Sequence, residues 1–526
     1  MKKKLSLALA LSAGLALVTQ AETYTFIKTA NTNWLTSNNG NWDPDGVPGA
    51  GDTVMTSATT TTAYNINLVS EVTTIENLIV DPAWKITATK NGEISAKTFN
   101  VTDTFTKSGS GDMIFTSGSG TLALNIDTVV FNSAALASGA SQNSVFFGYN
   151  QSDAQALSSL NISNGLTLHG SGAGLGNSSV FLNVEGETNL GELTYDGVTT
   201  GYNQFVYLIA SMGGEAKDRT INVKGINTAS IGQMRASAFA PTSGTNTATL
   251  VIDTDAGKTY SAYLQAADGV GGVMKLVKRG EGTQVLTFHS STYSGGTEVQ
   301  GGLLNAVVSA TSGNTPLGSG DVLLTGGNLQ VNIRNGEDLI TNKVITRSAD
   351  SYYGLIRAAG QSFAGYSLTS DLTGGIATTA ELIDGTASAT RNIKGSFRSA
   401  SDPQLLSDIL TLTGSGADTF VLQFIINGAG TDNFLVYWNG TSWVKAVSVT
   451  GGTPTFVEGA YDPGEHYALG TYGVDSETGE VWAVIDYDGE FAVSAIPEAA
   501  SAWILGSLAV LAVLVYRRRM TATGRN

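Results

Sequence analysis

The chain of 526 residues has no cysteine, only nine prolines and three histidines, and charged residues make up 14% of it. Without cysteine it has no disulfide framework and no zinc site of Cys/His composition. The histidines, His169, His289 and His466, lie far apart in the sequence. A structural zinc site is therefore excluded, and a large hydrophobic core has to stabilise the fold.

Positive charge is also scarce, since the formal net charge is −16. Seven of the basic residues lie in terminal segments, at Lys2–Lys4, Arg517–Arg519 and Arg525. The remainder has 21 basic and 44 acidic residues, a net charge of −23. An acidic surface repels the phosphate backbone, so we expect no nucleic-acid partner.

Glycine, in contrast, is abundant, and its 64 residues separate short runs of Val, Leu, Thr and Phe. The pattern is clearest over residues 278–329. Each run is long enough for a strand and too short for a helix, and the Gly-Gly pairs permit the positive φ angles of tight corners. This pattern predicts a chain that winds and stacks each strand on the previous coil, a β-solenoid.

The same stretch contains a spaced motif in which a lysine and two glycines precede a tyrosine, a Gly-Gly-Thr triplet, a valine, a glycine and a leucine. The residues are Lys278, Gly280, Gly282, Tyr293, Gly295, Gly296, Thr297, Val299, Gly302 and Leu304. The motif resembles the autotransporter-associated β-strand repeat of secreted bacterial surface proteins. The resemblance covers roughly a tenth of the chain. It implies a passenger-type right-handed parallel β-helix, and it supplies no catalytic residue.

The N-terminus has the three parts of a secretory signal peptide. Three lysines are followed by an apolar run from Leu5 to Val18 and by Thr19-Gln20-Ala21. We therefore predict a signal peptide over 1–21. A buried or membrane-spanning helix is the alternative, although the run is short for a span.

The C-terminus has the pattern of a membrane anchor. An uncharged run over 499–516 precedes an arginine cluster. It predicts a single transmembrane helix over 499–516, with the arginines and the tail 520–526 in the cytoplasm and the body outside.

The segment 496–519 also resembles the bacterial PEP-CTERM sorting signal. The matching residues are Pro497, Glu498, Arg517, Arg518 and Arg519, whereas Ala499 stands where the family usually has a second proline. The resemblance implies an exosortase, a membrane protease, as sorting partner. An ordinary tail anchor is the alternative, and it gives the same orientation.

Between these ends, the length and spacing of the alternating runs predict two parts of the chain. Residues 22–340 carry short, irregularly spaced alternating strands, which favour the β-solenoid over a β-sandwich. Near its start, the tract with Trp34 and Trp42 resembles the entry segment of repeat-bearing bacterial surface proteins. The two indoles are expected to cap the open end of the solenoid, and carbohydrate stacking is the alternative.

Residues 341–495 have longer alternating strands and a hairpin signal at Asn439-Gly440. They predict a compact antiparallel β-sandwich. Three tryptophans of this part, Trp438, Trp443 and Trp482, are expected in its core, with a sugar-binding platform as the alternative.

No set of residues in the sequence forms a recognisable catalytic centre. The tract Gly360–Ala364 lacks the final glycine of a nucleophile elbow. Candidate carboxylates for a polysaccharide lyase or hydrolase are Asp253, Asp255, Glu298 and Asp321. Two acidic turns, Asp43–Gly46 and Asp486–Gly489, have oxygen ligands but lack the spacing of known calcium loops.

The sequence therefore favours a non-catalytic, exported scaffold or adhesin of the cell surface or extracellular matrix, without catalytic residues, cofactor or metal. By resemblance, PEP-CTERM proteins accompany exopolysaccharide production, so an extracellular polysaccharide is the implied partner. The alternatives are an extracellular polysaccharide lyase or hydrolase and a carbohydrate-binding module. Carboxylates in mutual contact would favour the enzyme, and a coplanar row of exposed aromatics would favour the module.

Overall fold

The structure of the chain is a computed structural model. It describes residues 21–27, 32–34, 40–56, 64–68, 70–80, 84–87, 96–108, 112–117, 120–132, 143–148, 156–169, 178–196, 203–209, 217–228, 233–239, 246–269, 271–287, 291–308, 316–333, 345–347, 353–357, 366–370, 378–385 and 391–495. All but the last residue of the predicted signal peptide, and the sorting signal, transmembrane helix and tail predicted over 496–526, lie outside these residues. Within the described ranges no helix is long and apolar enough to cross a membrane.

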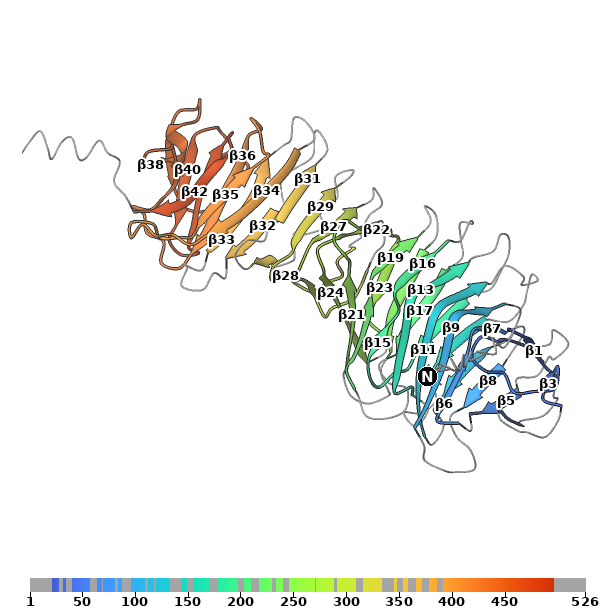
Figure 1. The fold of residues 1–526 in the computed structure, drawn as a ribbon. Helices are drawn as coiled ribbons and strands as arrows, with labels where there is room; N and C mark the ends of the chain where they lie inside the picture. Colours follow the sequence, from blue (N-terminus) through green and yellow to red (C-terminus); the bar gives the residue numbers. More distant parts are fainter. Residues whose placement is uncertain are drawn as a thin grey trace, which may run out of the picture.

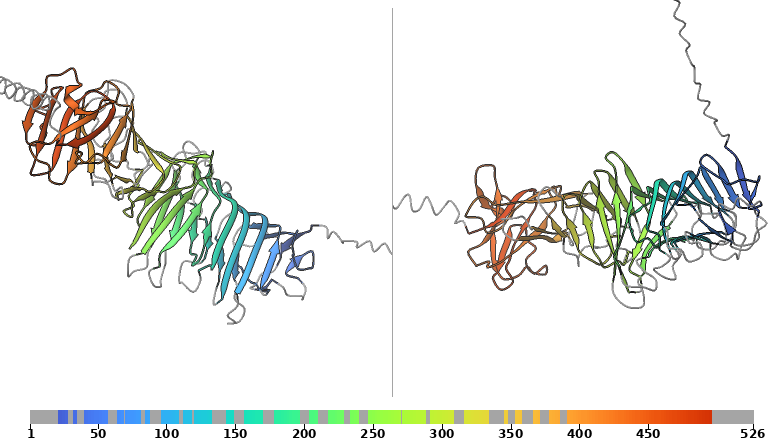
Figure 2. Two further views of the ribbon diagram at one scale, coloured as in Figure 1. Left: turned by 60° about the vertical axis from the view of Figure 1, so that its left-hand side comes forward. Right: turned by 60° about the horizontal axis from the view of Figure 1, so that its bottom comes forward.

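The fold is all-β, as the sequence predicts, and elongated. Figures 1 and 2 show strands that follow one another along the body in approximate sequence order, from the N-terminal end to the C-terminal end. The described helical structure is a single 3-10 turn, η2 (Ala446–Ser448). Glycine-broken runs of this length are too short for helices, which explains the all-β content.

Alternation of buried and exposed side chains defines the strands. In β9 (Ala96–Lys107), the apolar residues Phe99, Val101 and Phe105 are buried, and polar residues between them face outward. The alternation is interrupted at Thr102-Asp103, where both side chains are exposed. A period of two places one face of each strand in the core and the other in solvent.

The first of three parallel sheets runs along most of the body. Its strands, besides β9, are β1 (Thr23–Phe26), β4 (Thr53–Thr56), β6 (Val72–Ile75), β7 (Asn77–Val80), β11 (Thr121–Asn132), β13 (Ser159–His169), β15 (Thr188–Asn189), β16 (Glu192–Tyr195), β18 (Arg219–Val223), β19 (Gly225–Thr228), β21 (Asn246–Asp253), β24 (Gly272–Arg279), β26 (Thr297–Val299), β28 (Val322–Leu324), β30 (Ile345–Arg347) and β32 (Tyr366–Ser370).

The remaining parallel strands of the described residues form two further sheets. The second contains β2 (Thr32–Asn33), β5 (Tyr64–Asn67), β8 (Trp84–Thr87), β10 (Met113–Thr116), β12 (Asn143–Phe147), β14 (Ser178–Leu182), β17 (Asn203–Ile209), β20 (Gln233–Phe239) and β23 (Leu264–Ala267). The third contains β22 (Thr259–Ala262), β25 (Thr283–Thr287), β27 (Leu303–Val308), β29 (Asn328–Ile333) and β31 (Tyr353–Arg357).

The C-terminal part pairs antiparallel. On the first sheet it adds β33 (Thr378–Gly385), β36 (Phe420–Ile426), β41 (Glu480–Ile485) and β40 (Thr471–Asp475), with β39 (Thr455–Glu458) parallel to β40. On the third sheet it adds β34 (Arg391–Arg398), β35 (Ile409–Thr413), β42 (Gly489–Ser494), β37 (Phe434–Trp438) and β38 (Trp443–Lys445).

The change from parallel to antiparallel pairing comes later than the sequence predicts. The strands β30, β31 and β32 follow residue 340 and still pair parallel with earlier strands. The antiparallel strands then continue the same two sheets, and one cluster of buried side chains extends from Tyr24 to Val493. The C-terminal part thus covers the last parallel strands, whose edges and apolar faces would otherwise be open.

The N-terminal end is capped by the predicted tryptophans. Trp34 and Trp42 are buried, their ring centroids lie 5.0 Å apart, and the Trp42 indole donates a 3.4 Å hydrogen bond to the Trp34 carbonyl. The short strand β3 (Trp42–Asp43) crosses the edge of β1 in antiparallel orientation. Both indoles thus lie in the core at the N-terminal end, which is consistent with a capping role, and their burial rules out carbohydrate stacking on these rings.

Candidate functional site

The non-glycine residues of the repeat motif from Tyr293 to Leu304 lie in the core. Tyr293 is fully buried and shares a 2.5 Å hydrogen bond with the Thr297 hydroxyl, while Val299 and Leu304 are also buried. Gly302 has a φ of +60°, and a Cβ atom there would lie 2.3 Å from the Gly282 carbonyl oxygen. These residues therefore explain packing and turns, as expected of a structural repeat.

The other repeat glycines are packed closely as well. A Cβ atom at Gly295 would lie 2.5 Å from the Met274 carbonyl oxygen. Gly296 has a φ of +80°, and its Cβ atom would lie 2.9 Å from the Asp321 carbonyl oxygen. Since each contact is with the backbone in or beside a neighbouring strand, β24 or β28, these glycines permit adjacent strands and turns to approach one another.

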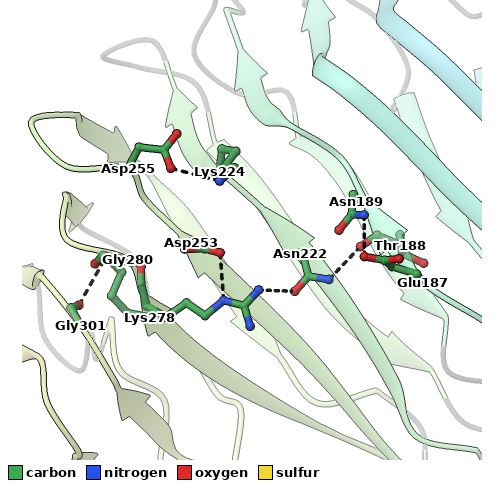
Figure 3. Close-up of polar contacts among 11 residues, drawn as sticks. Glu187, Thr188, Asn189, Asn222, Lys224, Asp253, Asp255, Lys278, Gly280 and Gly301 are labelled. Carbon is green, nitrogen blue, oxygen red and sulfur yellow. Dashed lines mark hydrogen bonds and ion pairs between the residues drawn. The ribbon is translucent and has the colours of Figure 1, made fainter.

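Lys278, the first residue of the repeat, is fully buried. Its Nζ atom donates to the carbonyl oxygens of Arg279 at 2.7 Å, Gly280 at 2.8 Å and Gly301 at 3.2 Å (Figure 3). Burial lowers the pKa of Lys278 to about 8, against the attraction of Asp253 and Glu281. The ammonium group thereby joins the turn between β24 and β25 to the turn between β26 and β27, a role that the sequence motif alone did not reveal.

Gln284 is a second internal polar residue that sequence reasoning missed. Its side chain is buried, accepts a 2.9 Å hydrogen bond from the Ile226 amide and donates a 3.0 Å bond to the Ile226 carbonyl. One amide group therefore satisfies both backbone groups of a residue in β19. A glutamine on the core side of a strand is the only signal in the sequence for this contact.

One register of the first sheet, which faces away from the core, aligns seven polar side chains with three apolar ones, of which Val251 and Val277 are buried. We define the outer column as the residues paired in sequence across ten neighbouring strands: Thr74, Asn100, Asn125, Asn161, Asn189, Asn222, Val251, Val277, Glu298 and Leu323. The five asparagines lie between buried residues on their strands, so their side chains face outward. Strand spacings of about 4.8 Å make the column about 43 Å long.

At the start of the outer column the side chains form hydrogen bonds with one another, and farther along they form hydrogen bonds with residues outside the column. The amide of Asn100 donates to the Thr74 hydroxyl at 3.1 Å, and Asn125 donates to the Asn100 carbonyl oxygen at 2.9 Å. Asn189 turns instead to Glu187 at 3.0 Å, and Asn222 donates to the Thr188 backbone carbonyl at 3.3 Å (Figure 3).

The fifth asparagine of the outer column is Asn161. Its side-chain amide makes no hydrogen bond to the described part of the chain and is half-buried. It borders a hollow of about 310 Å³, which we call the first hollow. Its polar lining includes Asn161, Asn189, Asn222, Lys224, Asp253 and Arg279. The series of side-chain hydrogen bonds along the outer column therefore ends where the first hollow begins.

Charges at the first hollow are paired. The Arg279 guanidinium donates to Asp253 at 3.0 Å and to the Asn222 side-chain oxygen at 3.4 Å, and the Lys224 ammonium lies 3.0 Å from Asp255. Figure 3 shows Asn189 and Asn222 on the neighbouring strands β15 and β18, with Lys224 just after the end of β18. The hollow thus combines amides with charged groups of both signs.

A second hollow, of about 320 Å³, lies farther along the same column. Its lining includes Lys275, Thr297, Glu298, Asp321 and Leu323. The Lys275 ammonium lies 2.7 Å from Glu298, and Leu323 is 37% exposed. The strand β24 contributes Arg279 to the first hollow and Lys275 to the second.

The pKa of Glu298 lies below its ordinary value. Partial burial acts to raise this pKa, and hydrogen bonds from Lys275, Gln300 and Thr325 outweigh it. The carboxylate is therefore ionised at neutral pH, which suits an acceptor better than a general acid.

Three of the four carboxylates considered as catalytic candidates are held by a basic partner. Asp253 pairs with Arg279, Asp255 with Lys224 and Glu298 with Lys275. Asp321 lines the second hollow. No group of three His, Cys, Asp or Glu side chains suited to a metal occurs among the residues that the structure describes.

The remaining candidates have local roles. Asp488, in an acidic turn, accepts 2.8 Å hydrogen bonds from the amides of Gly414 and Ser415. His169 pairs with Asp196 at 2.6 Å, and His466 stacks on Trp482. The tract 360–364 and the sorting residues Pro497, Glu498, Arg517, Arg518 and Arg519 lie outside the described residues.

The three C-terminal tryptophans do not form a flat platform. Trp482 is fully buried, and its indole donates to the Gly459 carbonyl at 2.9 Å. Trp438 and Trp443 face each other across β37 and β38, half-buried, with ring planes inclined by 56°. These rings are therefore not coplanar.

Comparison with known proteins agrees with the repeat. Residues 276–306 match the family model of the passenger-associated transport repeat. No curated protein and no solved structure matches the chain. Since the match includes Lys278, Tyr293 and Leu304 and coincides with strands of the parallel sheets, this all-β chain carries an autotransporter-associated repeat.

Proposed function

We propose that the protein is a non-catalytic surface scaffold whose outer column binds an extracellular polysaccharide. The observation that carries the proposal is the alignment of five outward-facing asparagines with two hollows on one register of the first sheet. Amides donate and accept hydrogen bonds, which suits the hydroxyl groups of sugars. The transport repeat at 276–306 is consistent with a surface-exposed protein.

We further propose that the parallel part is a right-handed β-solenoid. Its support is the pairing of each strand with one from the next coil, as in Asn100 with Asn125 and Asn125 with Asn161. Crossover connections between parallel strands are almost always right-handed. A solenoid also explains how one column of aligned residues can extend across ten strands.

Export by the signal peptide 1–21 and anchoring by the helix 499–516 are part of the same proposal, on sequence grounds. The body would then lie outside the inner membrane, where an exosortase could sort it to the surface or matrix. This location gives the outer column access to an extracellular polymer.

An enzyme acting on polysaccharide is the second candidate, because both hollows contain carboxylates. The ion pairs of Asp253 and Glu298 favour binding over catalysis, since each carboxylate is held by a neighbouring base. Product release from the bound polysaccharide would favour the enzyme.

The test is polysaccharide binding by the full-length protein and by the Asn161→Ala, Asn222→Ala double variant. We expect binding by the native protein, at least tenfold weaker binding by the double variant, and no release of reducing sugar. The matched control is Asn227→Ala, an exposed asparagine of β19 outside the column. Equal binding by all three proteins would refute the outer column as the site.

A further inference from the structure

The outer column also carries information on the charge and length of its ligand. We infer that the ligand is an uncharged, hydroxyl-rich polysaccharide that lies along the column and contacts both hollows. This inference rests on the proposed function and specifies the chemical class of the polymer.

The cationic side chains at both hollows are already paired with carboxylates. Arg279, Lys224 and Lys275 each have a carboxylate within 3.0 Å. An anionic sugar would have to compete with these carboxylates for the same cations. A cationic sugar would have to displace the cations from the carboxylates. The paired groups therefore favour a ligand that adds no charge of its own.

The net negative charge of the chain also acts on an approaching polymer through its electrostatic field. The net charge of −16 disfavours the approach of a polymer with many uronate or sulfate groups. Neutral hydroxyl groups experience no such repulsion. They can also pair with both ends of an amide, and the amide of Asn161 makes no hydrogen bond to the described residues.

The distance between the two hollows along the outer column sets the length of the ligand. Asn222 at the first hollow and Glu298 at the second are separated by three strand steps, through Val251 and Val277. Three steps correspond to about 14 Å. A single sugar cannot span this distance, whereas a short chain can occupy both hollows at once, so affinity should increase with chain length.

The experiment measures binding of the full-length protein to three immobilised groups of polysaccharide: uncharged glucans, galactans and mannans, the uronate polymers alginate and pectate, and the amino-sugar polymer chitosan. We expect binding to at least one uncharged polymer with little change between low and high salt, because no counterions are released. Oligosaccharides of increasing length should compete progressively better.

Two variants link the binding to the column. Asn161→Ala is expected to weaken binding about tenfold, the equivalent of one well-formed hydrogen bond. Asn161→Asp preserves the shape of the side chain and removes its donor, so it should weaken binding as well. A circular dichroism spectrum equal to that of the native protein shows that each variant is folded.

The outcomes separate this inference from the proposed function. Salt-sensitive binding to alginate, pectate or chitosan alone, weakened by Asn161→Ala, would overturn the uncharged ligand and leave the column as a binding site. Competition by a monosaccharide as strong as by a long oligosaccharide would overturn the contact with both hollows. Binding to no polysaccharide would overturn the proposed function itself.

Discussion

Replacing Lys278 with methionine tests whether a buried ammonium group holds two turns of the chain together. Methionine retains an unbranched apolar side chain and removes the charge. The three carbonyl oxygens at 2.7, 2.8 and 3.2 Å lose their donor. Hydrogen bonds to charged groups contribute roughly 1.5–3 kcal/mol each.

The burial of the ammonium offsets part of this contribution. Its pKa falls from 10.5 to about 8. At about 1.36 kcal/mol per unit, the charged form is disfavoured by roughly 3.4 kcal/mol relative to the neutral amine. Three such hydrogen bonds less this cost leave an expected loss of roughly 1–6 kcal/mol for Lys278→Met at neutral pH.

The pH dependence follows from the sign of the shift. Because the pKa is lower in the folded than in the unfolded chain, the unfolded chain binds more protons between pH 8 and 10.5. The free energy of unfolding of the native protein, relative to Lys278→Met, should be constant below pH 8 and should increase from there to pH 10.5.

The assay is denaturant unfolding of the full-length proteins, followed by tryptophan fluorescence. Lys224→Met is the matched control, because its ammonium is half-exposed in a surface pair and should contribute less than about 1 kcal/mol. A Lys278→Met variant as stable as the control would refute the role of the three hydrogen bonds. A difference that shrinks between pH 8 and 10.5 would refute the lowered pKa.

Other predictions concern turns, cap and anchor. Gly302→Ala should destabilise the protein by at least about 2 kcal/mol, because its φ is +60° and the new Cβ atom meets the Gly282 carbonyl. Gly257→Ala, at φ +76° in open space, should cost less, and equal denaturation midpoints would contradict the close packing. Trp42→Ala should cost about 3–5 kcal/mol and increase proteolysis at the N-terminal end, which an unchanged digestion pattern would disprove. Deletion of 496–526 should release the protein from the membrane fraction, and a truncated chain that still sediments with membranes would invalidate the anchor.

The sequence by itself determined the all-β class, the coil turns and the N-terminal cap. These features depend on local chemistry. Alternation in β9 places Phe99 and Val101 in the core, and Gly302 permits a positive φ. Trp34 and Trp42 are buried near the N-terminal end, where their rings contact Phe99 and Phe26.

Only the tertiary structure decided which residues share the outer column. Its asparagines, from Asn100 to Asn222, follow one another at intervals of 25, 36, 28 and 33 residues, because the connections between strands differ in length. No period in the sequence marks such a set, and strand register alone brings it together. The depth of Lys278 and the continuation of both sheets past residue 340 are decided in the same way, by pairing between residues distant in the chain.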